Sequence, residues 1–363
     1  MQNIKNLNMS KFVVFVVIII ISILLIFDFG IFQKKVDSDF SIVKLKNTDN
    51  LHRAFPSIVI DNTSIYIAFR EADSHMAHNG IIKVVKTSKS GNKFETIAKI
   101  QKNGFDLRDP KIHINDNGEL YVLYAQTKWS SDNFTVQDEV ASYISFLEKI
   151  SSDKFNVKPA KRVGFLGMEF SNHDRKEWIW LWDLTLHKGY YYGATYTDKK
   201  GEVYFVKSKD GVNFNFLKKI TLPGHLSEVS IEFDKDILVA VVRNDIGKGY
   251  FVRETPNNSE WDIFKLPIQL GGPQLNKIND QLIMSSRMYS SGGNQMQLYK
   301  LDFKNGAIQK YLIQLPSTGD TGYSDLKEDE DVLYMVYYSG KFNGKSDIYL
   351  ARISKSMILD IAL

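Results

Sequence analysis

Residues 208–214 read Ser-Lys-Asp-Gly-Val-Asn-Phe, a serine-x-aspartate-glycine-x-x-aromatic pattern that follows a run of strand-forming residues. An Asp-Gly pair between two such runs is a hairpin signal. We expect Asp210 to accept backbone hydrogen bonds, Gly211 to adopt positive φ, and Phe214 to fill the sheet. Residues 88–94, Ser-Lys-Ser-Gly-Asn-Lys-Phe, form a degraded second copy with Ser90 in the place of the aspartate. A repeated turn of this kind predicts a repeated β-sheet unit.

Working outward from this turn, short alternating or aromatic runs recur from Phe40 onward, with turn residues between them. We expect strands at 57–60, 64–69, 81–85, 120–124, 190–196, 203–206, 237–242, 281–284, 297–301, 332–338 and 348–352. Only about 136–150 reads as a helix. Many short strands without alternating helices favour an all-β sandwich array or a propeller.

The composition excludes several classes of protein and site. Of 363 residues, 46 are basic and 42 acidic, and this dispersed net charge of +4 does not indicate nucleic-acid binding. The absence of cysteine excludes disulfides, thiolate zinc sites and a cysteine nucleophile. The histidines lack metal-ligand spacing and no acidic calcium loop is evident, so we expect no metal and no other cofactor.

The N-terminal region is a separate unit. Residues 12–27 read FVVFVVIIIISILLIF without a charge, and lysines flank the run on both sides. With the residues up to about 32 it reaches the roughly 20 residues needed to cross a bilayer. No small-x-small cleavage site follows, so we expect an uncleaved signal-anchor helix rather than a cleaved signal peptide. Residues 1–36 would form a cytoplasmic tail and anchor, and 37–363 an extracytoplasmic domain, in a bacterial envelope.

The two copies of the turn resemble the Asp-box repeats of sialidase-type propellers. The similarity to the sialidase (neuraminidase) superfamily extends over roughly residues 45–355, because four further motifs occur in the family's order. The resemblance implies that residues 37–363 form a six-bladed β-propeller. The four motifs are His52-Arg53-Ala-Phe-Pro56, with one more residue before the proline than in the family; Glu228 fifteen residues before Arg243; Gly271-Gly272-Pro273 leading to Arg287; and Gly322-Tyr323-Ser324.

What the resemblance implies is an exo-glycosidase that removes a terminal sialic acid or related nonulosonic acid from a glycan with retention. Arg53, Arg243 and Arg287 would hold the substrate carboxylate, since a guanidinium matches its geometry. A carboxylate beside the anomeric carbon repels a carboxylate nucleophile, whereas the Tyr323 phenol is neutral until activated. Glu228 would take its proton, and the arginines would lower the pKa of the phenol.

Two further matches would line the pocket. Arg70, seventeen residues after Arg53, resembles a second pocket arginine of the family. Asp109, in Asp106-Leu-Arg108-Asp109-Pro110, resembles an aspartate that helps to bind the 4-hydroxyl or N-acyl region of the sugar. Asp106 and Arg108 could instead form a local ion pair.

The acid/base catalyst departs from the family pattern. Family members carry an aspartate on a flexible loop after the first arginine, but this chain has Ala77 and His78 at that offset. Asp73 could reach the site if the loop is remodelled. His75 could also protonate a leaving group, because its ordinary pKa lies near neutral pH. We rank Asp73 and His75 equally and His78 third.

A tryptophan-rich segment adds a further candidate. Trp178, Trp180 and Trp182 alternate along a predicted strand that leads to His187. The alternation is typical of rings stacked on one face of a sheet. It also fits a wall that stacks on sugars, with His187 nearby.

Two alternatives to the hydrolase reading remain open. The displaced aspartate would also fit a non-catalytic glycan-binding propeller that keeps the arginines. A changed loop would equally fit a hydrolase of a different acidic sugar in a bacterial surface polysaccharide.

Overall fold

The computed structural model describes residues 39–358, apart from 92, 131–132, 135–136, 152–153, 169–177, 198–200, 256–259, 292 and 341–343. This part of the chain is built from strands, with a single 3-10 turn at Lys355–Met357. The predicted all-β class is confirmed. No helix among the described residues is long and apolar enough to cross a membrane. The predicted anchor at about 12–32 lies outside the described residues.

The strands form five sheets, in which nearly all neighbouring strands are antiparallel. Four sheets have four strands each: β2 (His52–Ile60), β3 (Ser64–Ala72), β4 (Ile81–Ser88) and β5 (Glu95–Ile100); β16 (Leu226–Asp234), β17 (Ile237–Asn244), β18 (Tyr250–Glu254) and β19 (Trp261–Lys265); β20 (Gln274–Ile278), β21 (Gln281–Met288), β22 (Gln295–Leu301) and β23 (Ile308–Leu315); and β24 (Asp320–Asp329), β25 (Val332–Gly340), β26 (Ser346–Ser354) and β1 (Phe40–Lys44). The fifth holds β6 (Asp106–Ile114), β7 (Leu120–Trp129), β8 (Gln137–Ser151), β12 (Trp178–His187), β13 (Tyr190–Thr197), β14 (Glu202–Ser208), β15 (Asn213–Thr221) and β11 (Gly164–Leu166), while β9 (Lys154–Val157) and β10 (Lys161–Arg162) pair with β8.

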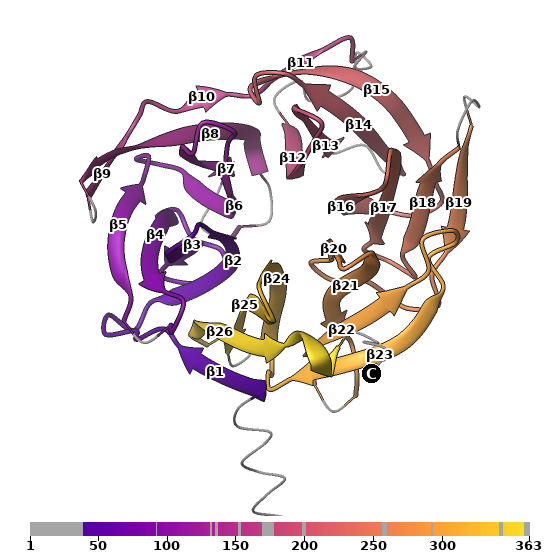
Figure 1. Ribbon diagram of the computed structural model, residues 1–363. Coiled ribbons are helices and arrows are strands. Elements are labelled where there is room, and N and C mark those ends of the chain that lie inside the picture. The colour runs from indigo at the N-terminus through magenta and orange to yellow at the C-terminus, as the bar shows by residue number, and fades with distance from the viewer. Residues whose placement is uncertain are drawn as a thin grey trace, which may run out of the picture.

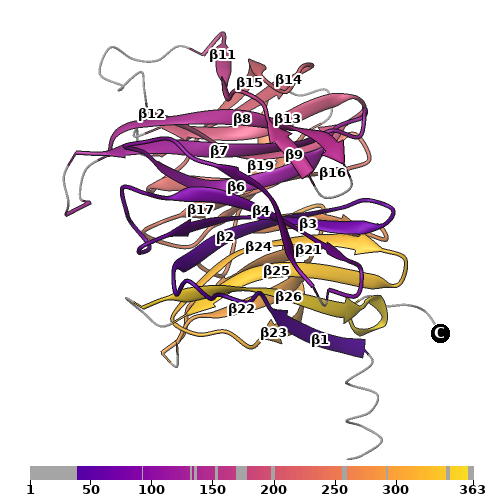
Figure 2. The same ribbon diagram turned by 90° about the vertical axis from the view of Figure 1, so that its left-hand side faces the viewer.

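The sheets stand around a common centre, with β2, β6, β12, β16, β20 and β24 innermost (Figure 1). The ten-stranded sheet consists of two groups of strands, β6–β10 and β11–β15, which are joined by a short parallel pairing of β8 with β12. The first strand, β1, pairs with the last, β26, at one edge of the molecule (Figure 2). The two ends of the described chain therefore share one sheet.

The predicted strands all occur, but the predicted helix at about 136–150 is wrong. That segment is β8, which pairs with β7 along most of its length. Val140, Ala141, Ile144 and Leu147 are buried at spacings that match one face of a helix. Ser142 and Ser145 are buried as well, so both faces of the strand are covered. Apolar residues on both faces of a strand remove the alternation that would have identified it.

The turn between β14 and β15 has the expected geometry. Asp210 Oδ1 accepts hydrogen bonds from the backbone N–H groups of Val212 and Asn213 at 2.8 and 2.7 Å. Gly211 has φ of 73°, and Phe214 is fully buried. The degraded copy between β4 and β5 keeps the glycine at positive φ, but Ser90 bonds only to the Ser88 hydroxyl in the contacts described.

A layer of buried polar side chains ties the innermost strands together. Each of these strands contributes one residue: Ser57, Lys111, Asp183, Ser230, Gln274 and Asp325. Ser57 Oγ donates to Asp325 at 2.7 Å, which links β2 to β24. Across the centre, Lys111 donates to Gln274 at 2.9 Å, and Gln274 donates to Asp183 at 2.7 Å. The first and last sheets are therefore joined by hydrogen bonds in the core.

Replacing Asp325 by alanine is expected to destabilise the fold by about 3 kcal/mol, because it leaves buried donors and a lysine without their acceptor. The carboxylate accepts from Ser57, from the Ile58 amide and, at 3.4 Å, from Lys327. Asp329→Ala on the same strand is the control, since its ion pair with Lys89 lies at the surface and should contribute little to stability. Urea unfolding of both variants measures the difference, and equal losses would contradict this role for the polar layer.

Candidate active site

The backbone itself helps to build the site, because strand pairing is broken on five of the innermost strands, and three of these breaks place a non-glycine residue at positive φ. The register of β2, β6 and β24 with their neighbours shifts just before the polar residue described above. The skipped positions hold Phe55, Asp109 and Tyr323, at φ of 57°, 49° and 50°. Bulges of this kind re-aim side chains and are common next to active sites. The Phe55 and Tyr323 rings meet with their centroids 4.9 Å apart.

Tyr323 forms a hydrogen-bonded pair with Glu228. The phenol donates to Glu228 Oε1 at 2.7 Å, and Glu228 is buried on β16. Arg243 Nη1, on the adjacent β17, donates to the same carboxylate oxygen and, at 3.3 Å, to the phenol oxygen. Glu228 Oε2 accepts from the Gly272 amide at 2.8 Å. The carboxylate is thus held with one oxygen against the phenol, as a proton acceptor must be.

The electrostatics keep the carboxylate ionised and the phenol protonated. Burial raises the pKa of Glu228, but the charge and hydrogen bonds of Arg243, with those of Tyr323 and Gly272, outweigh it and leave the pKa below its usual value. Burial and the Glu228 charge raise the pKa of Tyr323 well above 10, more than the two arginines lower it. The arginines thus lower the pKa of the phenol as expected, but burial and the Glu228 charge outweigh them in this state. The phenol would need Glu228 to take its proton during reaction.

Two glycines make room for this pair. Gly272 has φ of 57°, and a Cβ there would lie 2.8 Å from the Tyr323 amide nitrogen. Gly322 has φ of 154°, and a Cβ would lie 2.9 Å from Arg287 Nη2. Any side chain at either position would displace the tyrosine or the arginine. The Gly-Gly-Pro and Gly-Tyr-Ser motifs thus have a steric reason.

Arg243 and Arg287 meet at a cavity of about 570 Å³ beside the tyrosine. The cavity is lined by Ser74, His75, Met76, Phe134, Arg243, Arg287, Asp320, Tyr323 and Gly344. The Arg287 guanidinium carbon lies 5.8 Å from the Tyr323 ring centroid. Arg287 donates to the Thr321 carbonyl and to the Tyr338 hydroxyl, and it forms no ion pair with the described residues. Its charge is therefore available to an anion in the cavity.

Arg53 does not line this cavity. Its Nε donates to Glu71 on β3 at 2.7 Å, and Lys83 donates to the same carboxylate at 2.9 Å. Successive side chains of a strand point to opposite sides. His52 contacts Asp320 of the cavity wall, at 3.2 Å, so Arg53 next to it points away. The Arg53 guanidinium instead donates to the Glu71 carboxylate and, through Nη1, to the Lys46 carbonyl at 2.7 Å. The structure brings together two of the three predicted arginines.

Arg70 is also held by a carboxylate. It donates to both oxygens of Asp106, at 2.7 and 3.0 Å, and both residues are fully buried. Arg108 donates to Asp106 at 3.2 Å, so the local ion pair considered from the sequence is present. Arg108 also donates to the His75 carbonyl at 2.9 Å, and its guanidinium carbon lies 4.9 Å from the Phe55 ring centroid. These arginines therefore support the wall of the cavity.

Asp109 is a buried carboxyl close to the tyrosine pair. Arg108 Nε lies 3.9 Å from its Oδ2, while the buried Oδ1 has no hydrogen-bond partner. Burial, with the Glu228 charge, raises the pKa of Asp109 to about 7 against the opposing effect of Arg108. Asp109 is not among the residues that line the cavity, so the sugar contact implied by the resemblance stays a prediction.

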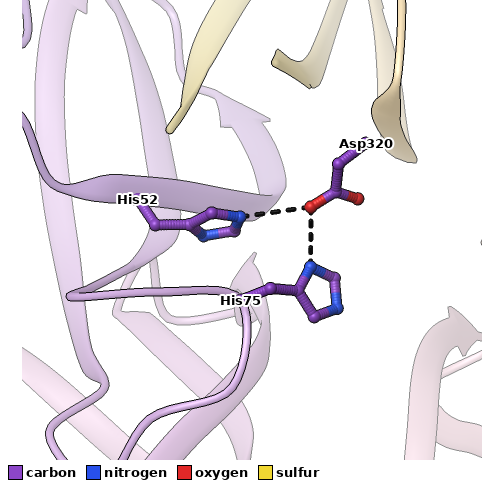
Figure 3. Close-up of side chains that lie close together, drawn as sticks. All are labelled: His52, His75 and Asp320. Carbon is purple, nitrogen blue, oxygen red and sulfur yellow. Dashed lines mark hydrogen bonds and ion pairs between the residues drawn. The ribbon is translucent and has the colours of Figure 1, made fainter. Parts of the chain in front are cut away.

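His75 lies in the cavity wall, where it is oriented by a carboxylate from the last sheet (Figure 3). Its Nδ1 lies 2.7 Å from Asp320 Oδ2, and His52 Nε2 lies 3.2 Å from the same oxygen. Tyr338 donates to the other oxygen at 2.8 Å. The second ring nitrogen of His75 points away from Asp320 in Figure 3. A carboxylate behind an imidazole fixes its tautomer, which is the arrangement of an acid/base histidine.

The same three side chains are the described group that could hold a metal ion, with donor atoms within 4.8 Å of one another. No motif in the sequence indicates this group, because His52, His75 and Asp320 are not close together in the chain. Their hydrogen bonds already pair both histidines with the carboxylate. We therefore interpret them as a hydrogen-bonded group.

Asp73 and His78 lie outside the cavity wall. Asp73 is exposed, and its carboxylate accepts from Asn79 at 2.9 Å. His78 is exposed and contacts the Phe134 ring. Of the loop residues ranked from the sequence, the structure brings only His75 to the tyrosine.

The tryptophans belong to the core rather than to a sugar-stacking wall. Trp180 and Trp182 are buried, and the Trp182 ring lies behind Tyr323 with centroids 5.6 Å apart. The side chain of Trp178 lies outside the described residues. His187 lies at the far end of β12, where it lines a different cavity.

No family model and no curated protein matches the sequence. Solved structures do match. A protein of unknown function from Dyadobacter fermentans DSM 18053 has a TM-score of 0.68 at 15% identity, over 87% of this chain and 99% of that chain. Trypanosoma rangeli sialidase in complex with sialic acid has a TM-score of 0.60 at 12% identity, over 86% and 58%. Phage phi92 endosialidase has a TM-score of 0.64 at 10% identity, over 90% and 70%. The chain has a sialidase-like fold, and it spans little more than half of the trypanosomal enzyme.

Proposed function

We propose that this protein is a retaining exo-glycosidase that removes a terminal acidic sugar, a sialic acid or a related nonulosonic acid, from a glycan. The observation that carries the proposal is the Tyr323–Glu228 hydrogen bond beside two arginines that face one cavity. A phenol held against a buried carboxylate, next to cations that fit a carboxylate, matches the needs of a sugar acid. One neighbouring structure is described as Trypanosoma rangeli sialidase with 2,3-difluorosialic acid as a covalent intermediate.

In the first step, the Tyr323 oxygen attacks the anomeric carbon and passes its proton to Glu228. The glycosidic bond breaks, and protonated His75 gives its proton to the leaving oxygen. In the second step, water attacks the anomeric carbon of the tyrosyl adduct and His75 takes the water proton. The phenol leaves and recovers its proton from Glu228. Arg287, with Arg243, holds the substrate carboxylate through both steps.

The setting proposed for this site is a six-bladed β-propeller with Asp-box turns. The ten-stranded sheet would count as two blades, and the β1–β26 pairing would close the ring. The propeller would stand outside the cytoplasm on an N-terminal signal anchor, because the apolar run at 12–27 precedes it.

The proposal is tested by incubating the detergent-solubilised full chain with fluorogenic glycosides of sialic acid and of other nonulosonic and ulosonic acids. Release of the fluorophore from at least one acid, and from no neutral sugar, is expected. Binding of an unsaturated sialic acid without turnover of any substrate would show that the protein binds glycans and is not a hydrolase. Neither binding nor turnover with the sialic acids, but turnover of another acid, would assign the different acidic sugar.

The pH dependence follows from the two proton-transferring groups. Burial lowers the pKa of His75 below 6.5 despite the hydrogen bond to Asp320, and the pKa of Glu228 lies below 4.5. His75 must be protonated and Glu228 ionised, so kcat/KM should be highest between these pKa values and fall as pH rises through that of His75. Asp320→Asn removes the interaction that raises the pKa of His75, so the alkaline limb should move to lower pH. A profile flat from pH 5 to 8 would contradict this assignment.

A further inference from the structure

A second cavity, of about 700 Å³, lies away from the tyrosine site. It opens between the far ends of β12 and β16 and is lined by residues of β12–β19. Phe233 of this cavity lies five residues further along β16 than Glu228, about 17 Å at the rise of a strand. His187, at the end of the tryptophan-rich segment, lines this cavity. The proposed reaction does not use this histidine.

Aromatic rings form much of the cavity wall. His187 stacks on Phe233 with centroids 4.0 Å apart and planes at 7°. Tyr192 meets Phe233 edge to face at 4.9 Å, and Tyr190 is 37% exposed. Phe233 is buried behind them, whereas the partly exposed Tyr190 and Tyr192 rings have flat faces on which the C–H faces of sugar rings can lie.

The charge beside these rings is positive. The Lys207 ammonium lies 4.0 Å from the Tyr190 ring centroid and 5.0 Å from that of Tyr192, and it forms no ion pair with the described residues. Lys209 lies 4.6 Å from the Tyr190 ring. Two acidic residues belong to the same wall. Asp236 is paired with Lys188 and accepts from His187 at 3.1 Å, and Glu254 accepts from the Leu238 amide at 3.3 Å.

We infer that this cavity binds a segment of an acidic polysaccharide. Tyr190 and Tyr192 stack on the sugar rings, and Lys207 pairs with a carboxylate of the chain. The Lys207 side chain is long and has rotatable bonds, so its ammonium can leave the rings when a sugar stacks on them and pair with the carboxylate of that sugar. The site is independent of the proposed hydrolase function, since none of its residues lines the tyrosine cavity. It would hold the protein on its glycan while the other cavity acts.

The inference is tested by titrating polysialic acid, polygalacturonate and hyaluronate into the detergent-solubilised full chain, with neutral dextran as the control ligand. At least one acidic polymer should bind, with an affinity that falls as salt rises. Lys207→Ala and Tyr190→Ala should each weaken binding about ten-fold, and Lys207→Arg should keep it. Lys93→Ala and Tyr311→Ala, at an exposed turn and on β23, are matched controls that should change nothing.

Three outcomes would overturn the inference: no acidic polymer binds better than dextran, binding survives Lys207→Ala and Tyr190→Ala unchanged, or the wild type instead retains a protein partner through these residues. Unchanged thermal unfolding of the variants excludes loss of the fold as the cause. Unchanged turnover of a fluorogenic monosaccharide by the same variants separates this site from the reaction at Tyr323.

Discussion

Replacing Tyr323 by phenylalanine should lower kcat/KM for the hydrolysed sugar acid about a thousand-fold or more, because removal of a nucleophile leaves only binding and electrostatic stabilisation. Among the described residues the hydroxyl hydrogen-bonds to Glu228 and Arg243, and the ion pair between those two remains without it. The fold should therefore be unaffected. Steady-state kinetics with a fluorogenic substrate give the ratio.

The control for this variant is Tyr289→Phe. Tyr289 is exposed beside Arg287, with the guanidinium carbon 5.6 Å from its ring, but it does not contact Glu228. Its removal should leave kcat/KM within about two-fold, as for a surface change away from the reacting atoms. Turnover by Tyr323→Phe at a tenth of the wild-type rate would rule out the phenol as nucleophile.

Replacing His75 by alanine should lower kcat/KM about 10²- to 10⁴-fold for substrates with a poor leaving group, which is the usual contribution of a general acid. The loss should shrink for substrates whose leaving phenol has a low pKa, since such a group departs without a proton. Stopped assays with an alkyl glycoside and an activated aryl glycoside of the same sugar measure both effects.

Asp73→Ala is the matched control, because the sequence ranks Asp73 and His75 equally. Asp73 is exposed and bonded to Asn79, so its removal should change neither substrate series. A larger loss in Asp73→Ala than in His75→Ala, restored by the activated leaving group, would move the acid to Asp73 and imply that the loop closes on the substrate.

Much of the fold could be predicted because its signals are local. The Asp210 turn and the alternating runs each depend on a few neighbouring residues. The β8 segment failed for the opposite reason. Both faces of β8 are covered by segments that are distant in the sequence, so apolar residues occur on both faces and their spacing resembles that of a helix.

The site was harder to predict because side-chain direction depends on a one-residue register. Arg53 sits in a motif that resembles a carboxylate-binding one, but His52 takes the side of β2 that faces Asp320, and Arg53 points to the other side, toward Glu71. Tyr323 and Asp109 reach the site through bulges, where ordinary alternation does not apply.

Asp320 was missed altogether. It meets His52 across 268 residues of sequence, through the contact between the first and last sheets. Asp320 lies three residues before Tyr323 on the same strand. This position indicates a site residue only if Tyr323 is already assumed to be the nucleophile.

The most direct test of the account is to trap the reaction on the protein. The full chain is incubated with 2,3-difluoro derivatives of sialic acid and of the related acid that it hydrolyses, then digested and analysed by peptide mass spectrometry. We predict one sugar adduct on the peptide containing Tyr323, lost in Tyr323→Phe and retained in Tyr289→Phe. Turnover of the parent sugar with no adduct from its difluoro derivative, or an adduct on any other residue, would contradict the central claim that this phenol is the nucleophile.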